Sequence, residues 1–130
     1  MLTKHQIFSA NDTHIEKVPV PDWGGDVGIR VISGAARDEL DVFLARIVDA
    51  KGNVINPAGL RTKVCVLSCC DESGDPIFEE KDIPALIAKS SVALDRVSDA
   101  AMKLNGLGKK AVEGARDDFL ADQKSESGSV

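Results

Sequence analysis

The stretch Val18–Asp38 decides the fold, and it reads V-P-V-P-D-W-G-G-D-V-G-I-R-V-I-S-G-A-A-R-D. In order, it contains a strand interrupted by prolines, the one tryptophan of the chain, a Gly-Gly turn, a second strand and the start of a helix. It holds no plausible set of catalytic side chains. The stretch therefore favours a protein that works by contact over an enzyme.

A β-hairpin is expected over about residues 14–32. In its first strand, Val18 and Val20 point to one face, while Pro19 and Pro21 cannot donate ladder hydrogen bonds and place the strand at a sheet edge. The paired glycines that follow permit a chain reversal at positive φ. The second strand alternates apolar and other residues through Val27, Ile29 and Val31. Because two strands alone are marginal in water, the apolar face must dock on helices or on another subunit.

Helical periodicity dominates the chain after Ser33, a suitable N-cap residue. The strongest stripe has the spacing i, i+3, i+4, i+7, i+8 and consists of Leu40, Phe43, Leu44, Ile47 and Val48. Residues 51–53, Lys-Gly-Asn, are expected to end this helix. The run 60–70 suits either a buried strand or a helix, and the preceding Asn56-Pro57 pair favours the helix.

Further helices are expected on both sides of this central part. Residues 3–9 form a short opening helix that Thr3 caps and that buries Ile7 and Phe8. Asp82 is expected to cap a later short helix, and Asn105-Gly106 to close the long one that follows it. These other helices are expected over residues 82–87, from Ser90 or Ser91 to the Asn105-Gly106 stop, and over 109–120. One face of the long helix is marked by the apolar residues Leu94, Val97, Ala101 and Leu104.

The predicted fold class is α+β, mainly α, with an N-terminal β-hairpin packed on a bundle of about four to five helices. Residues 1–122 are expected to form a single globular domain, with the hairpin at about 14–32 and the helices at about 34–122. The final residues 123–130, Q-K-S-E-S-G-S-V, have nothing to bury and are expected to be a disordered tail.

Composition disfavours several classes of function. The net charge is −5 and no run of Lys and Arg forms a basic stripe, so nucleic-acid binding is disfavoured. No apolar stretch reaches the roughly 20 residues that span a bilayer, and the N-terminus lacks the apolar region of a signal peptide. Three cysteines, two of them adjacent, do not suggest a disulfide framework. These features predict a cytoplasmic protein without a membrane partner.

The acidic loop after Cys70 has the spacing of a calcium-binding loop but lacks two of its requirements. The sixth position needs glycine for a sharp turn and is Pro76, and the twelfth is an aspartate instead of the longer glutamate. A polar turn followed by a helix cap is the preferred interpretation. The residues at positions 1, 3, 5, 9 and 12 are Asp71, Ser73, Asp75, Glu79 and Asp82.

The three cysteines, Cys65, Cys69 and Cys70, raise zinc binding or thiol catalysis as alternatives. Zinc needs about four ligands, and the two histidines, His5 and His14, lie far away near the N-terminus. No neighbouring base is available to activate a nucleophile, so the cysteines are interpreted as small buried side chains. Carboxylate pairs fall on predicted polar helix faces and no phosphate-binding loop is present. No catalytic residue, cofactor or metal ligand is therefore assigned.

Trp23 is the one side chain with two competing interpretations. Beside the glycines of the hairpin tip, it either packs into the core or anchors a partner, as buried aromatic side chains do in many interfaces. An unprotected edge strand strengthens the second alternative. We therefore assign Trp23, Val18 and Val20 as the candidate partner-binding residues.

The pattern V-P-x-W-G-G-x-V-x-I-R-x-I-S-G-x-x-R-D over Val20–Asp38 resembles the tail assembly chaperones of long-tailed bacteriophages, in particular the siphophage group that includes the lambda-type chaperone. Three downstream segments agree with it: Cys65–Phe78, Asp82–Leu86 and Ser91–Val97. The resemblance covers about residues 3–108.

The resemblance implies a non-enzymatic assembly factor that acts in the cytoplasm of the bacterial host. Such proteins bind the tape-measure protein and keep its long helices soluble while tail-tube subunits polymerise around it, and they are absent from the finished virion. The expected partners are thus the tape-measure and tail-tube proteins, together with further copies of the chain in a homo-oligomer. The alternatives are a structural morphogenesis protein, such as a head–tail connector subunit, and a small DNA-binding regulator, which the acidic charge disfavours.

Overall fold

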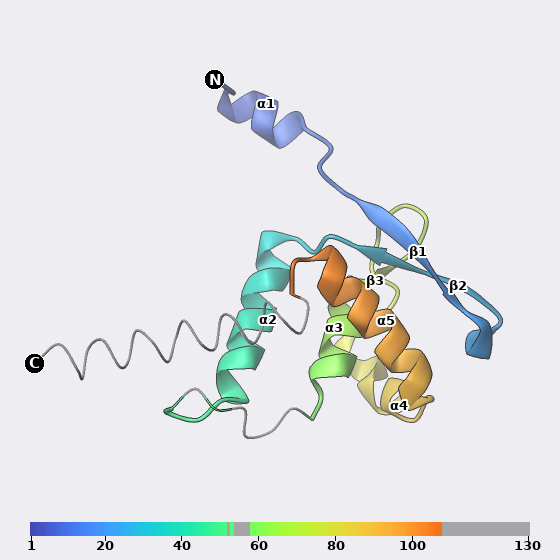
Figure 1. The fold of residues 1–130 in the computed structure, drawn as a ribbon. Coiled ribbons are helices and arrows are strands. Elements are labelled where there is room, and N and C mark those ends of the chain that lie inside the picture. Colours follow the sequence, from blue (N-terminus) through green and yellow to red (C-terminus); the bar gives the residue numbers. More distant parts are fainter. Residues whose placement is uncertain (52, 54–57, 108–130) are drawn as a thin grey trace, which may run out of the picture.

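The computed structural model describes residues 1–51, 53 and 58–107, which form a small antiparallel sheet covered by helices (Figure 1). The sheet has the order β1-β2-β3, and α5 packs on β1, β2 and α3. This arrangement confirms the predicted α+β, mainly α fold class. The elements run in the order α1 (Lys4–Ser9), β1 (Ile15–Val20), η1 (Pro21–Trp23), β2 (Gly25–Arg30), α2 (Gly34–Arg46), α3 (Leu60–Ser68), β3 (Cys69–Cys70), η2 (Glu80–Asp82), α4 (Ile83–Ile87) and α5 (Ser91–Leu104).

The predicted hairpin is present, with β1 at the sheet edge. The 3₁₀ turn η1 reverses the chain, and Gly24 completes it at φ +80°, a conformation that favours glycine. Val18 pairs with Val27 across the ladder. Val20 and Ile29 point inward and are 1% and 0% exposed. The alternation of apolar residues therefore directs one face of the hairpin into the core.

A third strand, β3, was not predicted from the sequence. Cys69 and Cys70 pair with Ile29 and Gly28 of β2. Gly28 permits this contact because a Cβ atom there would lie 2.6 Å from the carbonyl oxygen of Cys70. The run 60–70 thus contains both of the structures that its sequence allowed, first the favoured helix α3 and then a two-residue strand.

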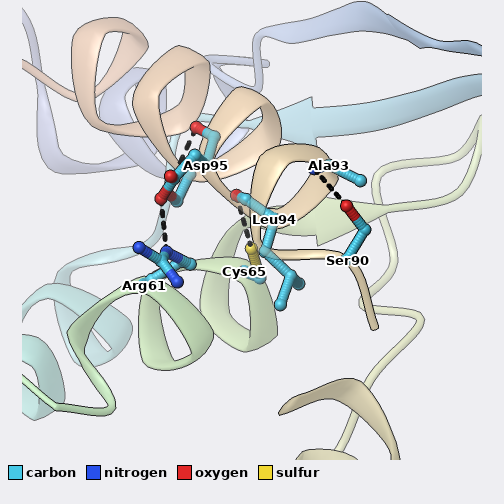
Figure 2. Close-up of polar contacts among 7 residues, drawn as sticks. Arg61, Cys65, Ser90, Ala93, Leu94 and Asp95 are labelled. Carbon is cyan, nitrogen blue, oxygen red and sulfur yellow. Dashed lines mark hydrogen bonds and ion pairs between the residues drawn. The ribbon is translucent and has the colours of Figure 1, made fainter. Parts of the chain in front are cut away.

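The helices α3 and α5 form the centre of the core (Figure 2). The Ser90 hydroxyl caps α5 by accepting a hydrogen bond from the backbone N–H of Ala93 at 3.4 Å. Arg61 of α3 forms an ion pair with Asp95 of α5, and Figure 2 shows the two side chains facing each other across the helix pair. Val97 and Ala101 of α5 are fully buried. The predicted start and apolar face of the long helix are confirmed.

Two helix ends differ from the predictions. The helix α2 ends at Arg46, before Ile47 and Val48, because the chain turns where the Asp49 carboxylate accepts hydrogen bonds from the backbone N–H groups of Lys51 and Asn53, both at 2.9 Å. The helix α3 begins at Leu60 after a glycine. The Asn-Pro pair expected to start it, at residues 56–57, lies outside the described residues.

Asn105 joins the end of α5 to the end of β2. Its side-chain carbonyl accepts from the backbone N–H of Ile32 at 2.9 Å, and its amide donates to the carbonyl oxygens of Arg30 at 3.1 Å and Ala101 at 2.9 Å. Gly106 follows at φ +69°. The predicted Asn-Gly helix stop is confirmed, and its asparagine also fixes the sheet to the helix.

The last part of the chain is described only to residue 107. The helix predicted over 109–120 and the tail predicted over 123–130 lie outside the described residues.

Asp82 precedes α4 as predicted, but its carboxylate accepts from the backbone N–H of Glu79 at 2.8 Å instead of capping α4. Among the described residues, no helix is both long and apolar enough to cross a membrane.

Candidate partner-binding surface

The first helix, α1, presents apolar side chains to solvent. A capping box starts it, in which Thr3 Oγ1 accepts from the backbone N–H of Gln6 at 3.2 Å and the Gln6 side chain accepts from that of Thr3 at 2.9 Å. Leu2, Ile7 and Phe8 are nevertheless 72%, 54% and 80% exposed. The prediction that Ile7 and Phe8 are buried is wrong, because α1 stands away from the rest of the molecule (Figure 1).

An open groove of about 360 Å³ lies between the start of α2, the end of α3 and the segment 76–80. Its apolar part comes from all three elements. Phe78 is half-buried within it, and the groove's charged lining residues are Arg30, Glu39 and Glu80. The apolar lining residues are Ala35, Ala36, Val66, Leu67, Pro76 and Phe78.

Arg30 fixes the side of the groove nearest the sheet. Its guanidinium donates to the carbonyl oxygen of Leu67 through Nε at 3.4 Å and Nη2 at 3.3 Å, and to that of Gly74 through Nη1 at 3.1 Å. These bonds connect β2 to the end of α3 and to the loop before Pro76. The groove wall is thereby held by a side chain whose charge is directed at backbone carbonyls.

Lys63 holds the two glutamates of the groove together. Its amine lies 2.5 Å from Glu80 Oε1 and 3.4 Å from Glu39 Oε1, and its side chain is only 11% exposed. Burial lowers the pKa of Lys63, but the hydrogen bond to Glu80 and the charge of Glu39 outweigh burial and leave the pKa above its ordinary value. Two carboxylates of the groove lining therefore share one ammonium group, and with Arg30 the positive and negative charges at the groove balance.

The residues assigned to partner binding from the sequence lie beside the core. Val18 and Val20 are buried, at 7% and 1% exposure, so a partner would have to displace the packed helices to reach them. Trp23 is half-buried and packs against the same cluster. Its packing agrees with the structural interpretation, and contact of any of the three residues with a partner stays a prediction.

The groove was not found from the sequence. Its lining residues come from three separate segments, at positions 30–39, 66–67 and 76–80, and no motif marks them as neighbours. Two local signals exist, namely the small residues Ala35 and Ala36 in the first turn of a helix and an arginine, Arg30, on the polar face of a strand. Neither signal identifies a groove without the tertiary structure.

The cysteines are buried, as predicted. Cys65, Cys69 and Cys70 are at most 3% exposed and none forms a disulfide. The Cys65 thiol donates to the carbonyl oxygen of Leu94 at 3.9 Å (Figure 2). A hydrogen bond with Cys65 and burial raise the pKa of Cys69, and burial raises that of Cys70. Both thiols therefore stay protonated and unreactive at neutral pH.

The acidic loop is a polar turn, in agreement with the preferred interpretation. The Asp71 carboxylate accepts from the backbone N–H groups of Ser73 at 2.8 Å and Asp75 at 3.0 Å. Glu79 lies in the next turn, where it pairs with Lys81. Within the part of the chain that the structure describes, no cluster of three or more His, Cys, Asp or Glu residues is arranged to hold a metal ion.

Comparison with known proteins gives one solved structure. No protein-family model matches the chain, and no curated protein matches it. Among solved structures, the chain is similar to the tail assembly chaperone of bacteriophage HK97. The two sequences are 20% identical, the alignment covers 81% of this chain and 92% of that chain, and the TM-score is 0.47. Neither value is high enough to assign a function to this chain.

Proposed function

We propose that this chain is a phage tail assembly chaperone, and that its groove binds apolar helical segments of the tape-measure protein. The proposal is carried by one observation: the sequence segments that resemble this family meet at the groove. Val20–Asp38 supplies Arg30 and both alanines of the lining, and Cys65–Phe78 supplies its other apolar residues. Sequence likeness and geometry thus point to the same surface.

The chemistry of the groove suits an apolar helix as its ligand. Aliphatic side chains and the ring of Phe78 line it, and Ala35 and Ala36 are small enough to let a partner backbone approach. An apolar helix that enters the groove buries its own side chains and gains about 25 cal/mol for each Å² removed from water. The net charge of −5 of the chain keeps the complex in solution. The proposed mode of action requires no chemical step, so the protein is proposed to be a non-enzyme.

Co-expression with the tape-measure protein from the same genome tests the proposal. We expect the tape-measure protein to become soluble and to co-purify with this chain. Ala35→Arg places a long charged side chain at the groove without touching the core, because Ala35 is exposed. It should lower the captured amount at least tenfold. Ala45→Arg, at an exposed position of the same helix away from the groove lining, is the matched control and should leave capture unchanged.

Two results contradict the proposal. Equal capture by the Ala35→Arg and Ala45→Arg variants, with both folded by circular dichroism, would show that the groove does not bind the client. Finding this chain in purified virions would contradict an assembly factor that is absent from the particle. That second result would instead support the structural alternative, a head–tail connector subunit.

A further inference from the structure

The part of the chain that the structure describes ends close to the groove. Its last residue, Leu107, belongs to the core and is 7% exposed. Two residues earlier, the side chain of Asn105 bonds to the backbone of Ile32 at 2.9 Å and of Arg30 at 3.1 Å. Arg30 lines the groove, and α2, whose first turn supplies more of the lining, begins two residues after Ile32. Residue 108 therefore continues from a fixed point beside the start of α2 (Figure 1).

The sequence that follows has the spacing of an amphipathic helix. Residues 109–120 lie outside the described residues and read K-K-A-V-E-G-A-R-D-D-F-L. Ala111, Val112, Ala115 and Phe119 fall at i, i+1, i+4 and i+8, which places them on one helical face. The residues of the opposite face are all charged, namely Lys110, Glu113 and Asp117. We call residues 109–120 the C-terminal segment.

We propose that the C-terminal segment docks in the groove of its own chain, with its apolar face toward the groove lining. The groove presents Val66, Leu67 and Phe78 to that face. Charge does not select this occupant, because Arg30 donates to backbone carbonyls and Lys63 already pairs with both glutamates of the lining. The apolar spacing of the segment and the point from which it starts select it.

The connection is long enough to reach the chain's own groove and short enough to favour it. Five residues lead from Leu107 to Val112, and five extended residues span up to about 17 Å. The four residues from Ile32 to Ala36, which lines the groove, span at most about 14 Å. A short flexible connection gives a local concentration in the millimolar range, so even a contact with a dissociation constant of about 1 mM is formed about half of the time. A segment from a second copy competes only at a similar protein concentration.

Gly114 limits how firmly the segment docks. A glycine inside a helix lowers the equilibrium constant for helix formation about fivefold relative to alanine. The docked segment is therefore expected to exchange with an undocked state that leaves the groove open. One consequence rests on the proposed function: if the groove binds the tape-measure protein, the segment competes with that client and restrains the chain until the client displaces it.

Hydrogen–deuterium exchange of the full chain, without any client, tests the docking. Phe119→Ser removes the aromatic ring of the apolar face, and exchange at groove residues 34–39 and 76–80 should become at least about twofold faster, as expected when a half-populated contact is lost. Leu120→Ser is the matched control, because Leu120 is the next residue but lies off that face. It should leave exchange at the groove unchanged. Gly114→Ala favours the helix and should slow exchange at the same residues.

Three results would overturn the proposal. The first is exchange at the groove that neither Phe119→Ser nor Gly114→Ala alters, and the second is an equal effect of Phe119→Ser and Leu120→Ser. The third is protection that grows with protein concentration together with the mass by light scattering, because the segment would then occupy a second copy. These measurements contain no tape-measure protein and do not depend on the proposed function. Once docking is established, Phe119→Ser should raise tape-measure capture about twofold, and unchanged capture would contradict only the proposed function.

Discussion

Replacing Asn105 by alanine is expected to destabilise the fold by about 2–3 kcal/mol, because it removes three hydrogen bonds at once. The side chain accepts from Ile32 N–H at 2.9 Å and donates to the carbonyl oxygens of Arg30 at 3.1 Å and Ala101 at 2.9 Å. Each such bond contributes a net stabilisation of about 1 kcal/mol, so the loss of three bonds sets the upper end of this range. The variant also frees the end of β2 from the end of α5.

Urea denaturation measures this effect with two signals. Circular dichroism reports the helices, and the fluorescence of Trp23, the one tryptophan of the chain, reports the hairpin. Asn11→Ala is the control, because Asn11 bonds only locally and is exposed. It should change the free energy of unfolding by less than about 0.5 kcal/mol. If Asn105→Ala lowers the free energy of unfolding by less than about 0.5 kcal/mol, with an unchanged m-value, the three hydrogen bonds do not stabilise the fold as expected.

Three further predictions concern the sheet, the tryptophan and the buried thiols. Gly28→Ala should lower the free energy of unfolding by about 1–3 kcal/mol, because its Cβ would meet the carbonyl oxygen of Cys70 at 2.6 Å. Gly34→Ala is the control in the same urea titration: its Cβ would have open space, and the free energy of unfolding should not fall. Trp23→Ala should lower stability by about 2 kcal/mol, because the half-buried ring packs on the core; if the oligomer mass falls with stability intact, the ring is a contact residue instead. The pKa of Cys69 and that of Cys70 are raised in the folded state, so their stabilising effect is complete below the unfolded thiol pKa and is lost as pH rises above it. The free energy of unfolding, measured by urea titration in reducing buffer, should therefore fall as pH rises from 8 to 10, by at most about 1.4 kcal/mol per thiol and pH unit. The hydrogen bond with Cys69 lowers the pKa of Cys65, which offsets part of this fall. Cys69→Ala should reduce the slope, and an unchanged slope would contradict the assignment.

The hairpin and the long helix could be predicted because their signals are local. Prolines cannot donate ladder hydrogen bonds, so they keep β1 out of the middle of a sheet. Gly24 adopts a positive φ because glycine has no side chain to hinder it. Ser90 needs only the next three residues to cap α5. In each case the physical cause lies within a few positions of the residue that reveals it.

The strand β3, the end of α2 and the exposure of α1 could not be predicted, because each depends on distant residues. Periodicity shows that Ile7 and Phe8 are apolar, but it does not show whether anything covers them. Cys69 and Cys70 leave the helix because Gly28 offers a close backbone partner more than forty positions earlier. The groove is missed for the same reason, since its walls meet only in the folded chain.

The proposed function requires this protein to bind an apolar helix in its groove. Hydrogen–deuterium exchange of the chain, alone and in complex with the tape-measure protein, measures such binding at the groove itself. Exchange is expected to slow on binding in the first turns of α2, at residues 34–39, and in segment 76–80, with α4 unchanged. Binding that leaves exchange at both groove segments unaltered, or no binding at all, would contradict it.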